Sequence, residues 1–167
     1  SREKYGKTME KKEKVLAAAD PGCGRVPVNK IIPFSAVDGP GNRTAVFLQG
    51  CNFDCRYCHN PETRNLCRNC GSCVGKCPKG ALFTDEDGKV RFCPEKCCGC
   101  DTCIHVCPFG CSPRIRMMCA EEVFAEVKKQ QPYIRGITVS GGECTLYPDF
   151  LEKLFVLARG AGLGTLI

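Results

Sequence analysis

The segment Thr44-Ala-Val-Phe-Leu-Gln49 leads through Gly50 into Cys51-Asn-Phe-Asp-Cys55-Arg-Tyr-Cys58. Its first six residues are mostly β-branched or apolar, which predicts a buried strand. The three cysteines have the spacing C-x3-C-x2-C, without a fourth cysteine at ferredoxin spacing. Three thiolates can hold three irons of a 4Fe–4S cube and leave the fourth iron open for chemistry. The pattern favours such an open cluster over a three-ligand zinc site or three loop thiols.

Two further groups of four cysteines, each followed by proline, come soon after this loop. Both read C-x2-C-x2-C-x3-C-P, and the second repeats the first thirty residues later. In bacterial two-cluster ferredoxins with this pattern, the fourth cysteine of each run ligates the other cluster. A pair of four-cysteine zinc sites would explain the number of cysteines but not the doubled spacing. We therefore assign one cube to Cys67, Cys70, Cys73 and Cys107, and a second cube to Cys97, Cys100, Cys103 and Cys77.

The composition bounds the class of protein. The chain has 167 residues, 17 cysteines and a formal net charge of +6. No apolar run approaches the ~20 residues of a membrane helix, and we expect no secretory leader. We therefore expect metal ligation in a reducing cytoplasm rather than a disulfide framework. The basic residues are scattered and bound clusters would add negative charge, so we expect neither a nucleic-acid nor a membrane partner.

The chain divides into four predicted parts. Residues 1–28 form a polar N-terminal segment with a short helix at Met9–Ala19, and residues 29–64 begin the catalytic domain. Residues 65–113 form an insert for the two ferredoxin-like clusters. In that insert, two short apolar runs flank Asp87-Gly88 and predict a hairpin. The remaining part, 114–167, continues the catalytic domain.

This last part contains alternating predicted elements. Apolar periodicity predicts helices over about Ala120–Gln130 and Pro148–Ala158. Cys119 stands at the N-cap position of the first helix, with Glu122 as half of a capping box. Strands are predicted at Ile137–Ser140 and Leu163–Ile167.

The order strand, helix, strand, helix, strand is typical of an α/β barrel with parallel strands. Active sites of such barrels lie on the loops after the carboxyl ends of the strands. The Cys51–Cys58 loop follows the first strand, and Gly141-Gly142-Glu143 follows the second. If these strands are neighbours, about 4.8 Å apart, the two loops can share one ligand.

The runs Val37-Asp-Gly-Pro-Gly-Asn-Arg43, Phe47-Leu-Gln-Gly-Cys51 and Tyr57-Cys-His-Asn-Pro61, together with Ser140-Gly-Gly-Glu143, carry a family resemblance. The chain resembles the radical S-adenosylmethionine activases of glycyl radical enzymes, a group that includes the pyruvate formate-lyase activase. Residues 29–61 look most like the YjjW-type subgroup. The resemblance implies a partial (β/α)6 barrel with an inserted two-cluster ferredoxin-like domain.

The resemblance also implies site residues. Cys51, Cys55 and Cys58 would hold the radical-generating cluster, whose open iron binds S-adenosylmethionine. Tyr57 would lie near the adenine, and Asp38 would face the glycine loop of the substrate protein. The methionine ammonium would be received by Gly141, Gly142 and Glu143, which suit it because glycines allow close backbone approach and a carboxylate pairs with an ammonium.

The resemblance implies a function as well. Three 4Fe–4S clusters and S-adenosylmethionine would be the cofactors, with reduced flavodoxin or ferredoxin as electron donor. The cofactor would yield a 5′-deoxyadenosyl radical that takes hydrogen from a glycine of a partner enzyme. We expect the chain to be a fragment, inactive alone, because the later strands of the barrel are missing. The alternatives are a radical enzyme acting on a small molecule, an electron-transfer ferredoxin module and a structural zinc protein.

Four cysteines of the folded part exceed the eleven predicted ligands. Their simplest interpretation is that of small buried hydrophobes or spare thiols. Cys98 stands next to a predicted ligand and is the one most easily mistaken for it. The four are Cys93, Cys98, Cys111 and Cys119. Cys144 stands where the resembling family usually has a proline after the Glu, and we do not expect it to be a ligand.

Overall fold

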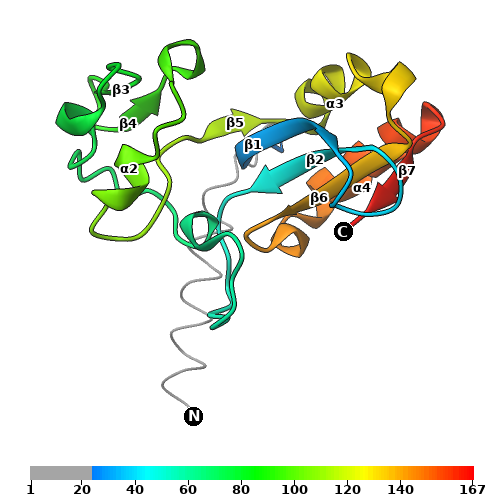
Figure 1. Ribbon diagram of the computed structural model, residues 1–167, viewed down its shortest axis with the longest axis horizontal. Helices are drawn as coiled ribbons and strands as arrows, with labels where there is room; N and C mark the ends of the chain where they lie inside the picture. Colours follow the sequence, from blue (N-terminus) through cyan, green and yellow to red (C-terminus); the bar gives the residue numbers. More distant parts are fainter. Residues whose placement is uncertain (1–23) are drawn as a thin grey trace.

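The computed structural model describes residues 24–167, so the predicted helix at Met9–Ala19 lies outside the described residues. These residues form a mixed α/β structure around a five-stranded sheet with the order β5-β1-β2-β6-β7 (Figure 1). A smaller lobe, which carries the hairpin β3–β4 and the short helix α2 (Thr102–His105), lies to one side of this sheet. None of the helices in this part of the chain has the length and apolar character needed to cross a membrane.

The three predicted strands of the main domain form the parallel part of the sheet. β2 (Arg43–Leu48) pairs with β6 (Gly136–Gly141), which pairs in turn with β7 (Gly164–Leu166). The helices between them are α3 (Ala120–Lys128) and α4 (Pro148–Gly160). The backbone N–H of Cys119 donates to the Glu122 carboxylate over 2.9 Å, which confirms the predicted N-terminal cap of α3.

Two strands were not predicted from the sequence, and both run antiparallel. β1 (Val26–Ser35) pairs with β2, and β5 (Arg116–Met118) pairs with β1. The strand is hard to recognise in the sequence because Pro27 and Pro33 interrupt the alternation of apolar and polar residues. Its pairing with β2 also contains two irregularities in register. Proline is tolerated at Pro33 because β5 covers only Val26–Val28, which leaves the later part of β1 as a sheet edge. The sheet thus begins at Val26, earlier than the boundary predicted after residue 28.

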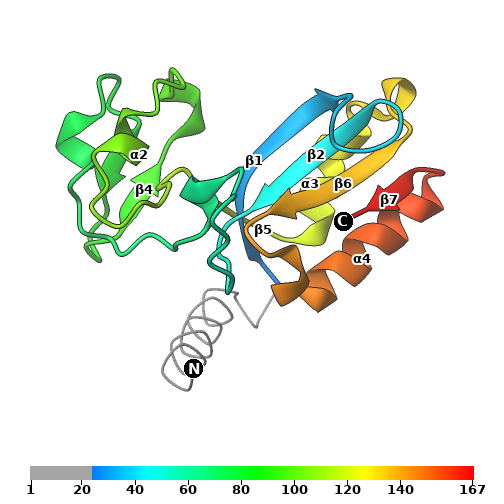
Figure 2. The same cartoon turned by 60° about the horizontal axis from the view of Figure 1, so that its bottom comes forward.

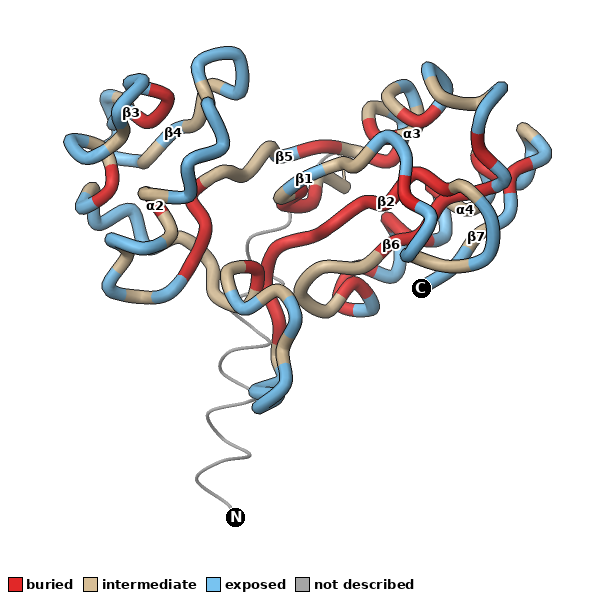
Figure 3. The backbone as a smooth tube through the Cα atoms, viewed as in Figure 1, coloured by how far each residue is buried: buried red, intermediate tan, exposed pale blue. Residues whose placement is uncertain are grey.

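The main core lies between one face of the sheet and the two helices (Figure 2). β2 is buried along its whole length, as Figure 3 shows. The helices contribute the positions that their 3.6-residue period predicted. Buried core residues from the helices are Ala120, Val123, Val127, Phe150, Leu151, Leu154 and Ala158.

The smaller lobe has its own core and hairpin. β3 (Leu82–Thr84) pairs antiparallel with β4 (Val90–Phe92), as the apolar runs around Asp87-Gly88 predicted. Its core is small: only Leu82, Cys73 and Cys103 are fully buried in it. The partly buried residues that pack against them are Val74, Cys77, Val90, Phe92 and Ile104. So little apolar burial suggests that this lobe depends on what its cysteines bind, as small metal domains do.

Arg43 connects the three parallel strands from within the sheet. Its guanidinium is buried, with 5% of the residue exposed. Nε donates to the Thr138 hydroxyl over 2.8 Å, and Nη2 donates to the carbonyls of Ile137 (2.8 Å) and Gly164 (3.2 Å). Buried polar groups are stable only when hydrogen-bonded, so these acceptors and the arginine depend on one another.

Replacement of this arginine should weaken the sheet. In Arg43→Met, the buried acceptors on β6 and β7 lose a charged donor, so we expect the free energy of unfolding to fall by about 2–4 kcal/mol. Urea unfolding followed by circular dichroism measures the change. Arg159→Met, on the exposed surface of α4, is the control and should cost less than about 1 kcal/mol. Equal losses in the two variants would contradict the role of Arg43.

Candidate functional site

The carboxyl ends of β2 and β6 join the two predicted functional loops. Leu48 lies opposite Gly141 in the parallel pairing, so the strands are neighbours, as the shared-ligand hypothesis required. Beyond the strands, the N–H of Gly142 donates to the Leu48 carbonyl over 2.9 Å, and the N–H of Glu143 donates to the Gly50 carbonyl over 2.8 Å. The Gly-Gly-Glu loop is therefore bonded directly to the residue that precedes Cys51.

The two glycines of this junction are required by the neighbouring backbone. A Cβ added to Gly141 would overlap the Leu48 backbone, and one added to Gly142 would overlap the Gly50 carbonyl. Gly141 also has a φ of 110°, which side-chain-bearing residues rarely adopt. The sequence suggested that glycines here admit a ligand; the structure adds that they admit the adjoining strand.

Glu143 is oriented by the turn that follows it. Its carboxylate accepts hydrogen bonds from the Thr145 backbone N–H (3.1 Å) and the Thr145 hydroxyl. This arrangement caps the short 3-10 helix η5 (Cys144–Leu146). Cys144 points inward, donates to the Val139 carbonyl over 3.6 Å, and has its pKa raised to about 11 by burial. It therefore stays a protonated core thiol.

The Cys51–Cys58 loop changes from buried to exposed along its length. Cys51 is 7% exposed, Cys58 is half-buried and Cys55 is exposed. The backbone N–H of Phe53 donates to the Cys51 sulfur over 3.4 Å. The side chain of Tyr57, predicted to lie near an adenine, is 90% exposed and so available to a ligand. Every cysteine of the described residues is a free thiol.

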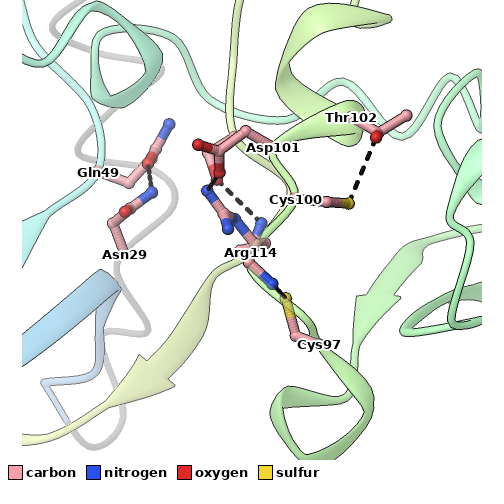
Figure 4. A network of polar contacts seen from close by, with 9 residues as sticks. Asn29, Gln49, Cys97, Cys100, Asp101, Thr102 and Arg114 are labelled. Carbon is pink, nitrogen blue, oxygen red and sulfur yellow. Dashed lines mark hydrogen bonds and ion pairs between the residues drawn. The ribbon is translucent and has the colours of Figure 1, made fainter.

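Gln49 holds the two ends of this loop together, a role that sequence reasoning missed. It is fully buried, and its amide nitrogen donates to the carbonyls of Glu62 and Asn65, both over 2.7 Å. Its amide oxygen accepts from Asn29 on β1 over 2.7 Å (Figure 4). Its backbone carbonyl accepts from the hydroxyl of buried Tyr147 over 3.0 Å. The only sequence signal was a polar residue between an apolar strand and Gly50.

Asp38 is not brought to the cluster loop. It lies on the connection between β1 and β2, at the opposite end of β2 from Cys51. Its carboxylate accepts from the Ser35 hydroxyl, and its carbonyl accepts from the Thr138 hydroxyl. In the described residues Asp38 thus fixes a loop next to Arg43, and a contact with a partner protein stays a prediction.

The eight ferredoxin-like cysteines line two separate cavities in the smaller lobe. The first cavity is lined by Cys67, Cys70, Cys73 and Cys107, with Cys111 as a fifth thiol. The second is lined by Cys77, Cys97, Cys100 and Cys103, with Cys98 as a fifth. Each set combines three cysteines of one run with the last cysteine of the other. Within residues 24–167, no three His, Cys, Asp or Glu side chains form a group suited to holding a metal ion.

The thiols around these cavities have different electrostatic surroundings. Hydrogen bonds with Ser72 and Thr102 lower the pKa values of Cys70 and Cys100, which favours their thiolates. Burial raises the pKa of Cys73 to about 11. In the second cavity Arg114 forms an ion pair with Asp101 over 2.5 Å and contacts the Cys97 sulfur (Figure 4).

The remaining predicted spare thiols have separate surroundings. Cys93 donates to the Glu95 carboxylate over 3.1 Å, and Cys119 stands at the start of α3. Cys98 is exposed, whereas Cys111 is buried, with its sulfur 3.4 Å from the Cys107 sulfur. Hydrogen bonding with Cys67 and burial both raise the pKa of Cys111, so it stays a thiol.

The strand junction can be tested by filling the space of one glycine. Gly142→Ala should lower the free energy of unfolding by about 1–3 kcal/mol, because the new methyl group displaces the Gly50 backbone. Urea midpoints measured by circular dichroism report the change. Gly160→Ala is the matched control, since no atom lies within 4 Å of the added Cβ. An unchanged midpoint in Gly142→Ala would show that the two loops are not in close contact.

Comparison with known proteins finds similarity in the part of the chain that contains the Cys51–Cys58 loop. The profile of a family described as "4Fe-4S single cluster domain" matches residues 37–89. The chain is 33% identical over 159 residues to the isethionate sulfite-lyase activating enzyme of Desulfovibrio desulfuricans, covering 84% of this chain and 51% of the relative. It is 36% identical over 146 residues to the indoleacetate decarboxylase activating enzyme of Tractidigestivibacter scatoligenes, covering 72% and 46%.

A third relative extends the pattern. The benzylsuccinate synthase activating enzyme of Thauera aromatica is 33% identical over 146 residues, covering 76% of this chain and 44% of the relative. The chain thus spans about half the length of these curated relatives. The chain is therefore similar to several activating enzymes, and a further relative, from Haemophilus influenzae, is named a putative glycyl-radical enzyme activating enzyme.

Proposed function

We propose that this chain supplies the cluster-binding part of a radical S-adenosylmethionine activase that acts on a glycyl radical enzyme. The observation that carries the proposal is the junction of the two loops at the carboxyl ends of β2 and β6. One loop carries three thiols with a spacing suited to an open cluster, and the other carries Glu143. The proposed iron ligands and the proposed ammonium-binding carboxylate therefore lie on loops that follow adjacent strands, where one bound molecule can contact both.

In this proposal, Cys51, Cys55 and Cys58 hold a 4Fe–4S cluster that leaves one iron open. When bound, the cluster and S-adenosylmethionine supply a 5′-deoxyadenosyl radical that removes hydrogen from a glycine Cα of the partner enzyme. Glu143 receives the methionine ammonium, aided by the backbone at Gly141 and Gly142. Exposed Tyr57 is free to cover the adenine. Asp38 approaches the partner's glycine loop in this proposal. It lies at the opposite end of β2 from Cys51, so its position does not support this role.

The two cavities of the smaller lobe accommodate two further 4Fe–4S clusters in this proposal. The crossed grouping of cysteines around each cavity supports it, because two-cluster ferredoxins share their fourth ligands in the same way. These clusters relay electrons from reduced flavodoxin or ferredoxin, or shape the surface that meets the partner. We interpret residues 65–113 accordingly as a ferredoxin-like insert.

The longer protein in this proposal completes a (β/α)6 barrel of which β2, β6 and β7 are the first parallel strands. The YjjW-type subgroup remains our proposal for residues 29–61. The relatives' names attach them to different glycyl radical enzymes, including a sulfite-lyase and a decarboxylase. We therefore propose the partner only as a class, in the cytoplasm of an anaerobically growing cell.

Metal content is the first test. The eleven ligands predict about twelve irons and as many sulfides per chain after anaerobic reconstitution. Iron and sulfide assays with Mössbauer spectra measure this, and Cys51→Ala/Cys55→Ala/Cys58→Ala should lower the iron to about eight. Zinc in place of iron in anaerobically purified protein would refute the proposal. A value near eight that the triple variant does not change would mean that the radical-generating cluster does not form.

Cofactor cleavage separates the two kinds of cluster. In the full-length protein, Cys55→Ala should abolish reductive cleavage of S-adenosylmethionine and formation of the glycyl radical, because the open iron is lost. Cys70→Ala is the matched control from the smaller lobe and should retain some cleavage. Chromatography of 5′-deoxyadenosine and electron paramagnetic resonance of the partner measure the two steps. If wild-type protein carries all its clusters yet cleaves no cofactor, an electron-transfer module becomes the better assignment.

A further inference from the structure

The two cavities of the smaller lobe are repeats of each other with an offset of thirty residues. Positive φ values recur at the offset: Asn69 with Gly99, Gly71 with Asp101, and Gly80 with Gly110. Hydroxyl groups recur as well, because Ser72 contacts Cys70 and Thr102 contacts Cys100. The two cysteine runs therefore have the same backbone conformations and the same hydroxyl contacts at equivalent positions.

The match breaks at the position four residues after the last cysteine of each run. The first run has Ala81 there, which lines the second cavity, and the second run has Cys111, which lines the first cavity. Both residues are 1% exposed, so neither contacts bulk water. The first cavity thus contains a buried thiol where the second contains only a methyl group.

Cys111 is placed to act on one of the predicted ligands. Its sulfur lies 3.4 Å from the Cys107 sulfur, within hydrogen-bond range for thiols. A cysteine that ligates iron has given up its proton and can only accept. The single proton of this contact must therefore remain on Cys111.

A hydrogen bond to a ligating sulfur changes the redox balance of the cluster. Reduction adds negative charge to the cluster, and a nearby donor stabilises that charge more strongly in the reduced form. The effect is greatest where water cannot supply a competing donor. Cys98, the extra thiol of the second cavity, is exposed, so water can replace its hydrogen bond.

We infer that Cys111 is a positioning residue whose buried thiol donates a hydrogen bond to the Cys107 sulfur and raises the reduction potential of the cluster that Cys107 helps to hold. The inference rests on the proposed function insofar as the first cavity binds a 4Fe–4S cluster. It predicts that the two clusters of the smaller lobe differ in reduction potential, although their ligands have the same spacing in sequence. The ligands themselves are unchanged, and only the hydrogen bonds to their sulfurs differ.

The test is a redox titration of the reconstituted full-length protein, monitored by electron paramagnetic resonance. The background variant Cys51→Ala/Cys55→Ala/Cys58→Ala removes the third cluster, so only the two clusters of the smaller lobe contribute. Cys111→Ala should move one of the two midpoint potentials to a lower value. Cys111→Ser keeps a donor and should restore much of the difference. Ala81→Cys places a thiol at the matched position and should raise the other midpoint.

The controls separate this inference from the function on which it rests. Cys98→Ala removes the exposed extra thiol and should leave both midpoints unchanged. Iron analysis of every variant should give about eight irons; failure of the background protein to bind iron would refute the proposed function itself. Loss of about four irons in Cys111→Ala would show that Cys111 is a ligand, which overturns the inference. Unchanged midpoints in Cys111→Ala with full iron would overturn it as well.

Discussion

The buried amide of Gln49 is the interaction on which the candidate site depends. It lies between the end of β2 and the first cluster cysteine, and it bonds to both Glu62 and Asn65 beyond the loop. A buried donor without a partner is costly, so the amide fixes how the loop returns to the sheet. Asn29 and Tyr147 bond to the same residue from β1 and from the start of α4. The sheet, the cluster loop and the second helix therefore share one polar centre.

The glycines at the end of β6 show how a binding loop can also be a packing requirement. Gly141 and Gly142 leave room for the backbone between Leu48 and Gly50, and that contact holds Glu143 beside the cluster loop. A side chain at either position would push the two loops apart, whether or not a cofactor is bound. Binding and folding therefore constrain these residues together.

Sequence reasoning succeeded where signals were local or periodic. The parallel strands, both helices and the small hairpin follow from apolar patterns, and the Cys119–Glu122 cap follows from residue types three positions apart. It failed for β1 and β5, because prolines and register irregularities hide β1 and only three residues form β5. It also missed Arg43 and Gln49, since a polar residue beside an apolar run reads as exposed unless its buried partners are known. Those partners lie on other strands and loops.

The sequence by itself determined the chemistry that we predict for this chain. The spacing of eleven cysteines predicts thiolate ligands without reference to the fold, and the family resemblance predicts an ammonium partner for the Gly-Gly-Glu turn. Only the tertiary structure decided which groups meet: parallel pairing joins the Cys51 loop to Glu143, and it leaves Asp38 at the other end of β2. It also decided that Cys111 is buried in the lining of the first cavity, whereas Cys98, in the lining of the second, is exposed. The reason is physical, because spacing along a chain sets local geometry, whereas burial and contact depend on segments that are distant in sequence.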